Sequence, residues 1–186
     1  MNNIIMITGE GRSGKNTVAE SIKEIIKCEI IGNADKVWEI AEKQFNWNGQ
    51  RDNKGRQLSF DITEAGYNYD FNFFEKITHH KMSLHNKNNI KNFIIPDWRY
   101  IRTFEYFTFF NNVITVKVVR HGFNNGNSSS IKNDKWMNER LHDFSFDRII
   151  VNDGTIQDLF NRTADLLSDY SKVFYNDRRM TMEAPC

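Results

Sequence analysis

The chain has 186 residues and a mass of 22.0 kDa, the size of one ordinary domain with a packed core. Its formal net charge of +1 and sequence pI of about 7.8 argue against the basic surface that draws proteins to polymeric nucleic acid. The 2 cysteines, Cys28 and Cys186, give neither a disulfide framework nor a metal-binding spacing, which is typical of a reducing compartment. The apolar run near the N-terminus is too short for a signal peptide or a membrane span.

The segment from residue 4 to residue 17, IIMITGEGRSGKNT, predicts a strand, a phosphate-binding loop and a helix. Glycines let the backbone turn its N–H groups inward, the lysine ammonium can reach the β- and γ-phosphates of a nucleotide, and the amino end of a helix attracts anions. A glycine-rich turn without a ligand is the alternative, and the flanking strand and helix weigh against it. The expected nucleotide-binding residues are Gly9, Gly11, Arg12, Ser13, Gly14, Lys15, Asn16 and Thr17.

The residue after the lysine departs from the common form of this loop. That form places Ser or Thr directly after the lysine, where the hydroxyl binds magnesium. Here Asn16 stands at that position and Thr17 follows one step later.

Short apolar runs alternate with helical patterns along the rest of the chain. After the first strand, strands are predicted at 28–31, 93–95, 113–119 and 147–151. Helices are predicted at 17–27, 34–45, within 61–81, at 100–110 and at 155–167, with Asp35 as an N-cap and Phe45 on a buried stripe. Residues 46–60 are predicted to be a polar loop. This alternation without hairpin signals predicts an α/β fold with a five-stranded parallel sheet between helices.

Charged residues gather where predicted strands end, and in open parallel sheets ligands collect at that edge. Asp97 could hold a magnesium ion or accept a proton from the attacking group, and Arg99 could bind a phosphate. An Asp–Arg pair that only caps the next helix is the alternative. Arg120 ends the fourth strand, and the turn 152–154 follows the fifth.

Two irregular stretches add further positive charge. In the loop 46–60, Arg51 and Arg56 could fork onto a phosphate, and a solvated loop is the alternative. Residues 121–134 consist almost wholly of turn formers, as is typical of a cover over an active site. With Lys132, Lys135 and Arg140, such a cover would suit an enzyme that expels water before it moves a phosphoryl group.

Together these motifs resemble the deoxynucleoside monophosphate kinases of the bacteriophage type, a branch of the P-loop nucleoside monophosphate kinases. The resemblance spans residues 4–167. It rests on five segments in the same order: GEGRSGKNT at 9–17, WNGQRDNKGRQL at 47–58, IIPDWR at 94–99 with Glu105 downstream, VVRHG at 118–122 and FDRIIVNDGT at 146–155. The family commonly has Asp where this chain has Asn16, so weaker metal affinity is expected here.

The resemblance implies a three-layer P-loop fold in a single domain, with a helical acceptor-binding insertion at 33–90, a short lid at 121–140 and a C-terminal tail at 168–186. It implies Mg2+-assisted in-line transfer of the γ-phosphoryl of ATP to a deoxynucleoside 5'-monophosphate. The implied catalytic residues are Lys15, Asp97, Arg99 and Arg120, and the implied metal ligands are Asn16, Thr17 and Asp97. The adenine would be bordered by Asn152, Asp153 and Gly154. The acceptor would be bound by Arg56, Asp97, Trp98 and Arg99. The lid would contain Lys132 and Arg140.

Two other functions stay open at this point. One is a kinase of the same fold with another acceptor, dephospho-coenzyme A or a modified base in phage DNA. The other is a nucleotide-binding module without turnover, which the missing hydroxyl after Lys15 suggests. For the kinase we expect a small-molecule nucleotide as the partner, and no binding to a membrane or to polymeric nucleic acid. A homodimer stays open. We expect the protein to act in the cytoplasm, or in the host cytoplasm if it is viral.

Overall fold

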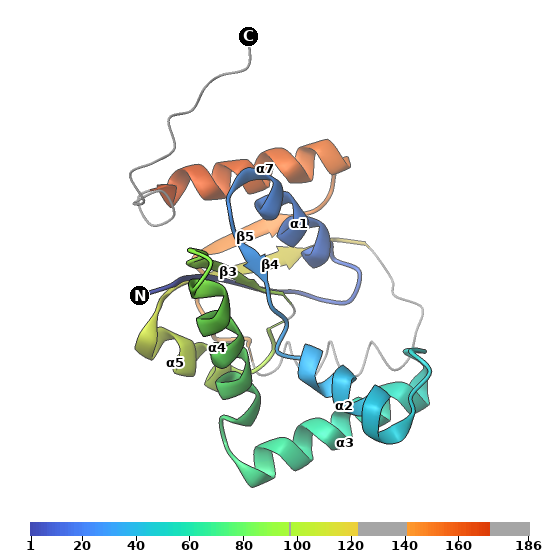
Figure 1. The fold of residues 1–186 in the computed structure, drawn as a ribbon. Helices are drawn as coiled ribbons and strands as arrows, with labels where there is room; N and C mark the ends of the chain where they lie inside the picture. The colour runs from blue at the N-terminus through green and yellow to red at the C-terminus, as the bar shows by residue number, and fades with distance from the viewer. Residues whose placement is uncertain (97, 123–140, 172–186) are drawn as a thin grey trace.

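Five parallel strands form one sheet in the order β2-β3-β1-β4-β5 (Figure 1). The computed structural model describes residues 1–96, 98–122 and 141–171. The strands are β1 (Asn3–Thr8), β2 (Glu29–Ile30), β3 (Asn92–Ile95), β4 (Asn112–Val119) and β5 (Arg148–Val151). The central strand β1 pairs with β3 on one side and β4 on the other. This sheet confirms the predicted α/β class, and its parallel strands all bring their carboxyl ends to one edge.

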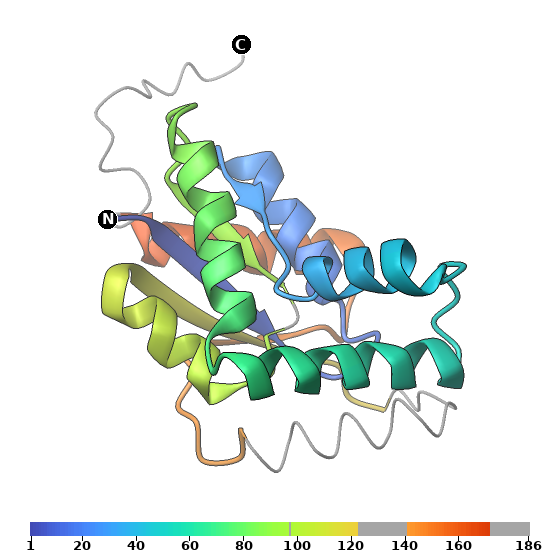
Figure 2. The same ribbon diagram turned by 60° about the horizontal axis from the view of Figure 1, so that its bottom comes forward.

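Helices cover both faces of the sheet, which makes a three-layer molecule (Figure 1). On one face lie α1 (Lys15–Ile25) and α7 (Ile156–Asp169), and on the other lie α4 (Phe73–Asn86) and α5 (Ile101–Phe110). The remaining two helices, α2 (Asp35–Phe45) and α3 (Asn53–Tyr69), lie side by side and extend beyond the sheet (Figure 2). None of the helices in the described part of the chain is long and apolar enough to cross a membrane.

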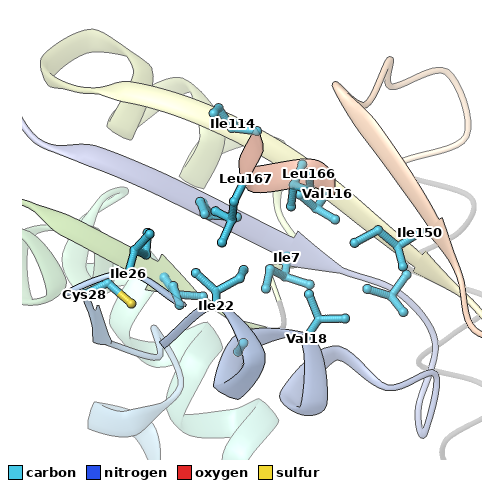
Figure 3. Packing of buried hydrophobic residues seen from close by; sticks show 14 of the residues in the cluster. Ile7, Val18, Ile22, Ile26, Cys28, Ile114, Val116, Ile150, Leu166 and Leu167 are labelled. Atoms are coloured by element: carbon cyan, nitrogen blue, oxygen red, sulfur yellow. The ribbon is translucent and has the colours of Figure 1, made fainter. Parts of the chain in front are cut away.

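The alternation of side chains along β1 explains the two main cores. Ile5 and Ile7 point to the face covered by α1 and α7, whereas Ile4 and Met6 point to the face covered by α4 and α5. Figure 3 shows the first of these cores, where Ile7 lies near Val18 of α1. Because β1 is buried on both faces, its residues form a continuous apolar run. The strand leads directly into the loop that follows it.

A third, smaller core joins the α2–α3 pair to α4. It consists of the buried side chains Val37, Ala41, Ile62 and Phe74. The α2–α3 pair therefore has a small core of its own, which it shares with α4 through Phe74.

The polar stretch predicted as a loop at 46–60 is shorter than expected. Helix α3 already begins at Asn53, because the side chain of Asp52 caps it by accepting a hydrogen bond from the Gly55 amide at 2.8 Å. Phe45, which was expected on the buried stripe of α2, is 58% exposed. The stripe ends one turn earlier, at Ala41.

Two helix boundaries also differ from the prediction. The N-cap of α2 is Ala34, and the Asp35 carboxylate instead accepts a hydrogen bond from the Gly32 amide at 2.9 Å. The last helix runs to Asp169, and Tyr170 packs against the α1–α7 core. The predicted tail therefore begins later than residue 168.

Candidate nucleotide-binding site

The loop between β1 and α1 has the backbone geometry that the glycines predicted. Gly9 has φ +145° and lies against β4, where a Cβ atom would come within 2.2 Å of the Val118 carbonyl oxygen. Gly14 has φ +106° and is the N-cap of α1, and Arg12 has φ 62°. The backbone thus has a positive φ at residues 12 and 14, and a helix starts directly afterwards. This conformation directs successive backbone N–H groups to one side, which is the arrangement of an anion-binding nest.

Lys15 lies at the first position of α1 and is 8% exposed. Its Nζ donates hydrogen bonds to the carbonyl oxygens of Gly9 at 2.8 Å and of Glu10 at 2.7 Å. The ammonium group is thus folded over the loop, within reach of the N–H groups that the loop presents. A positive charge and a set of amides are held together at the end of β1.

Ser13 carries a buried hydroxyl that lacks a partner. Its side chain is 3% exposed, and its Oγ makes no hydrogen bond in the described part of the molecule. Its carbonyl oxygen, by contrast, accepts a hydrogen bond from Asn152 Nδ2 at 2.8 Å. An unsatisfied buried hydroxyl inside a nest of amides fits a phosphate oxygen as its missing partner.

Asn152 ties the loop to the last strand of the sheet. Its backbone N–H donates to the Val119 carbonyl at 2.7 Å, and a Cβ on Gly14 would meet its Nδ2 at 2.6 Å. The next residue, Asp153, accepts a hydrogen bond from Arg162 Nη1 at 2.6 Å, which lowers the pKa of this carboxyl group. Asn152 therefore positions the phosphate loop, and the contact of residues 152–154 with adenine stays a prediction.

The connection after β3 reaches the same edge of the sheet. The Trp98 backbone N–H donates to the Ile7 carbonyl at 2.9 Å, which places Trp98 beside the last residues of β1, with Arg99 next in the sequence. Arg99 is half-buried, and Arg120 is exposed directly after β4. The structure thus brings the phosphate loop, Arg99 and Arg120 to the carboxyl edge of neighbouring strands.

The side chain of Trp98 belongs to the core. It is 2% exposed and packs against Phe104, Phe144 and Phe146, and its Nε1 donates to the Tyr100 carbonyl at 2.5 Å. The indole fills the space under the connection, and the role of Trp98 in acceptor binding stays a prediction.

Arg56 lies in the first turn of α3, on the insertion. It is half-buried, and its Nε donates to the Arg51 carbonyl at 3.0 Å. Arg51 itself lies over the ring of Trp38, with 4.9 Å between the guanidinium carbon and the ring centroid. These contacts hold the two arginines on the α2–α3 pair, and the role of Arg56 in phosphate binding stays a prediction.

Several predicted site residues lie outside the described residues. They are Asp97 and the lid residues Lys132, Lys135 and Arg140. The two metal candidates on α1, Asn16 and Thr17, are exposed in its first turn. Among the described residues, no three His, Cys, Asp or Glu side chains form a group that could hold a metal ion.

One buried polar group was missed by the sequence analysis. Glu75 of α4 is 0% exposed, and its Oε1 accepts hydrogen bonds from Tyr67 Oη at 2.9 Å and from Thr103 Oγ1 at 2.6 Å. Glu75 shares one helical face with Thr78 and Met82, at positions i, i+3 and i+7, and the structure buries all three; Met82 is the one apolar residue of the three that could have indicated this face from the sequence.

Comparison with known sequences finds no match to a protein-family model or to a curated protein. Comparison with solved structures finds the same fold. A dephospho-CoA kinase from Campylobacter jejuni aligns over 92% of this chain and 98% of its own, with a TM-score of 0.56 and 18% identity. The protein TT1252 from Thermus thermophilus aligns over 90% of this chain and 97% of its own, with a TM-score of 0.58 and 14% identity. At these identities the likeness shows the fold alone, which this chain shares with the Campylobacter jejuni dephospho-CoA kinase and the Thermus thermophilus protein.

Proposed function

We propose that this protein is an ATP-dependent phosphotransferase that phosphorylates a deoxynucleoside 5'-monophosphate. The observation that supports it most is the loop 9–17, in which left-handed backbone turns, the buried Lys15 ammonium and the unpartnered Ser13 hydroxyl lie together at the head of α1. All three features offer hydrogen-bond donors or positive charge to the same small volume. A chain of oxyanions such as a triphosphate is their natural ligand.

In this mechanism the protein binds and orients rather than forming a covalent intermediate. The loop amides and Lys15 hold the donor phosphates, and Asn152 keeps the loop in shape through its hydrogen bond to the Ser13 carbonyl. Arg99 and Arg120 bring positive charge to the equatorial oxygens of the moving phosphoryl group. Asn16, Thr17 and Asp97 would hold a magnesium ion, which would neutralise charge on the phosphates.

The acceptor enters from the side of the insertion. Helices α2, α3 and α4 belong to the region 33–90 that the sequence resemblance assigns to the acceptor, and Arg56 of α3 and Arg99 after β3 would be anion contacts for the acceptor phosphate. Lys132 and Arg140 would complete the site from the lid, so that water is excluded when both substrates are bound. A nucleoside monophosphate acceptor rests on the motif resemblance described above.

Dephospho-coenzyme A is the second candidate acceptor, and one observation favours it. The Campylobacter jejuni protein with the same fold is a dephospho-CoA kinase, and this chain covers 98% of its length. Dephospho-coenzyme A and a deoxynucleoside monophosphate both contain a nucleotide, and a kinase for either one needs the same ATP site. The ATP site therefore does not distinguish the two acceptors, and an activity assay does.

The test is a panel of acceptors with ATP and magnesium, in which ADP release is measured by a coupled assay. The panel contains the deoxynucleoside and ribonucleoside monophosphates, dephospho-coenzyme A and DNA. We expect a deoxynucleoside monophosphate to give the highest kcat/KM, and Lys15→Ala to lower it by about 10²–10³-fold with the circular dichroism spectrum unchanged. Lys27→Ala, at an exposed lysine that follows the end of α1, is the matched control. ATP binding without transfer to any acceptor would instead identify a non-catalytic module.

A further inference from the structure

Arg162 of α7 holds the turn that follows β5. Its Nη1 donates hydrogen bonds to the backbone carbonyl of Val151, the last residue of β5, and to the carboxylate of Asp153 at 2.6 Å. The N–H of Asn152 donates to the Val119 carbonyl on β4, so the Val151 carbonyl in the same peptide group points away from β4. Because β5 is an edge strand, this carbonyl faces no neighbouring strand of the sheet. Arg162 supplies the donor that the edge lacks.

Asn152 stands between the two groups that Arg162 binds. The hydrogen bond to Val151 fixes the peptide group before Asn152, and the bond to Asp153 fixes the residue after it. The side chain of Asn152 reaches in another direction, where its Nδ2 donates to the Ser13 carbonyl at 2.8 Å. The direction of this amide therefore depends on the backbone that Arg162 holds.

The amide of Asn152 meets the phosphate loop where the loop has no spare room. A Cβ atom on Gly14 would come within 2.6 Å of Asn152 Nδ2 and within 3.4 Å of Leu159 Cδ2 of α7. Ser13, whose carbonyl accepts the hydrogen bond, also carries the buried hydroxyl without a partner in the described part of the molecule. Because these residues directly precede Lys15, a shift of Asn152 displaces the peptide groups that would hold the donor phosphates.

We propose that Arg162 is a positioning residue of the donor site, which holds the phosphate loop in shape through Asn152, an inference that rests on the proposed function. The path runs from Arg162 to the backbone on both sides of Asn152 and from the Asn152 amide to the Ser13 carbonyl, with a hydrogen bond at each link. Contiguous hydrogen bonds of this kind can carry energetic coupling between a helix and a distant site. Arginine suits the position because one terminal nitrogen carries two N–H groups, one for each acceptor.

A second Arg–Asp pair between β5 and α7 provides the matched control. Arg148 Nη2 lies 2.9 Å from Asp169 Oδ2, and these side chains are 42% and 53% exposed, against 41% and 55% for Arg162 and Asp153. Arg148 begins β5 and Asp169 ends α7, so this pair lies at the opposite end of both elements from the turn beside the loop. Exposed ion pairs contribute little to stability, and neither Arg→Met variant should prevent folding.

Calorimetric titration with ATP and with inorganic tripolyphosphate, both in the presence of magnesium, tests the inference. We expect Arg162→Met to raise the Kd of both ligands roughly 3- to 5-fold, and Arg148→Met to leave both unchanged. Tripolyphosphate has the phosphates of ATP without the adenine, so a loss for both ligands means that the effect passes through the loop. A loss for ATP alone would place Arg162 at the adenine and would overturn the inference.

A double variant separates the positioning role from a purely structural one. In an Asn152→Ala background, Arg162→Met should change either Kd by less than about 2-fold, because the path is already broken. A full 3- to 5-fold loss in that background, or no loss in the wild-type background, overturns the inference while the kinase assignment stands. Should Arg162→Met fail to fold, Asp153→Ala replaces it, since it removes only an acceptor, and it should raise both Kd values; unchanged values overturn the inference.

Turnover in the acceptor panel distinguishes this inference from the proposed function. The expected changes in Kd without transfer to any acceptor would support the role of Arg162 and refute the kinase. A wild-type protein that binds neither ATP nor tripolyphosphate would refute both.

Discussion

Replacing Gly9 by alanine measures how tightly the phosphate loop is fitted against the sheet. The new Cβ would lie 2.2 Å from the Val118 carbonyl oxygen, and this oxygen is fixed because Val118 is part of β4. Backbone strain at φ +145° costs about 1–3 kcal/mol, and overpacking costs about 1–3 kcal/mol more. The sum of about 2–6 kcal/mol corresponds to a fall in Tm of roughly 5–20 °C for a domain of this size.

Gly49→Ala is the matched control for this prediction. Gly49 also has a positive φ, +85°, but nothing lies within 4 Å of its Cβ position. Alanine there should cost only about 1–2 kcal/mol, from the left-handed conformation alone. The two variants are compared by thermal unfolding and by ATP titration, and only Gly9→Ala should lose ATP affinity. If both variants showed the same Tm and the same ATP affinity, the close approach of the loop to β4 would be refuted.

Three further predictions follow from single contacts. Asn152→Ala removes the donor to the Ser13 carbonyl and should raise the KM for ATP by roughly 5-fold, since such a bond is worth about 1 kcal/mol; an unchanged KM would contradict its positioning role. Thr155→Ala removes the capping box of α7 and should lower Tm by about 2–4 °C without changing any KM, which differential scanning calorimetry checks. Burial raises the pKa of the Cys28 thiol to about 12, so in a Cys186→Ser background it should react with iodoacetamide at pH 8 only after unfolding. Because the thiol ionises more readily in the unfolded chain, its contribution to stability should be full below about pH 9 and should be lost as the pH rises toward 12.

The sheet and the phosphate loop were predictable because their signals are local. The run Ile4–Ile7 followed by three glycines and Lys15 specifies strand, loop and helix within a few residues. Thr155 and Asp158 form a capping box that marks the start of α7 in the same way. Each of these features depends on neighbours in the sequence; the strand, the loop and the start of the last helix at residue 155 were predicted, and the capping box itself was seen only in the structure.

The features that were missed depend on partners far along the chain. Trp98 follows a buried strand and precedes an arginine, which suggests a binding role, but its surroundings are set by Phe144 and Phe146 some 50 residues later. Glu75 accepts hydrogen bonds from side chains on two other helices, and charge alone would place it on the surface. The start of α3 was misplaced because the Asp52 cap was read as part of a polar loop.

The central claim is that the loop 9–17 binds the triphosphate of the donor nucleotide. A crystal structure with a non-hydrolysable ATP analogue and magnesium tests it most directly. We predict the β- and γ-phosphates inside the loop, hydrogen-bonded to its amides, with Lys15 Nζ turned from the carbonyls of Gly9 and Glu10 toward the phosphate oxygens and with Ser13 Oγ donating to one of them. An analogue bound elsewhere on the protein, with Lys15 still on those carbonyls, would contradict the account.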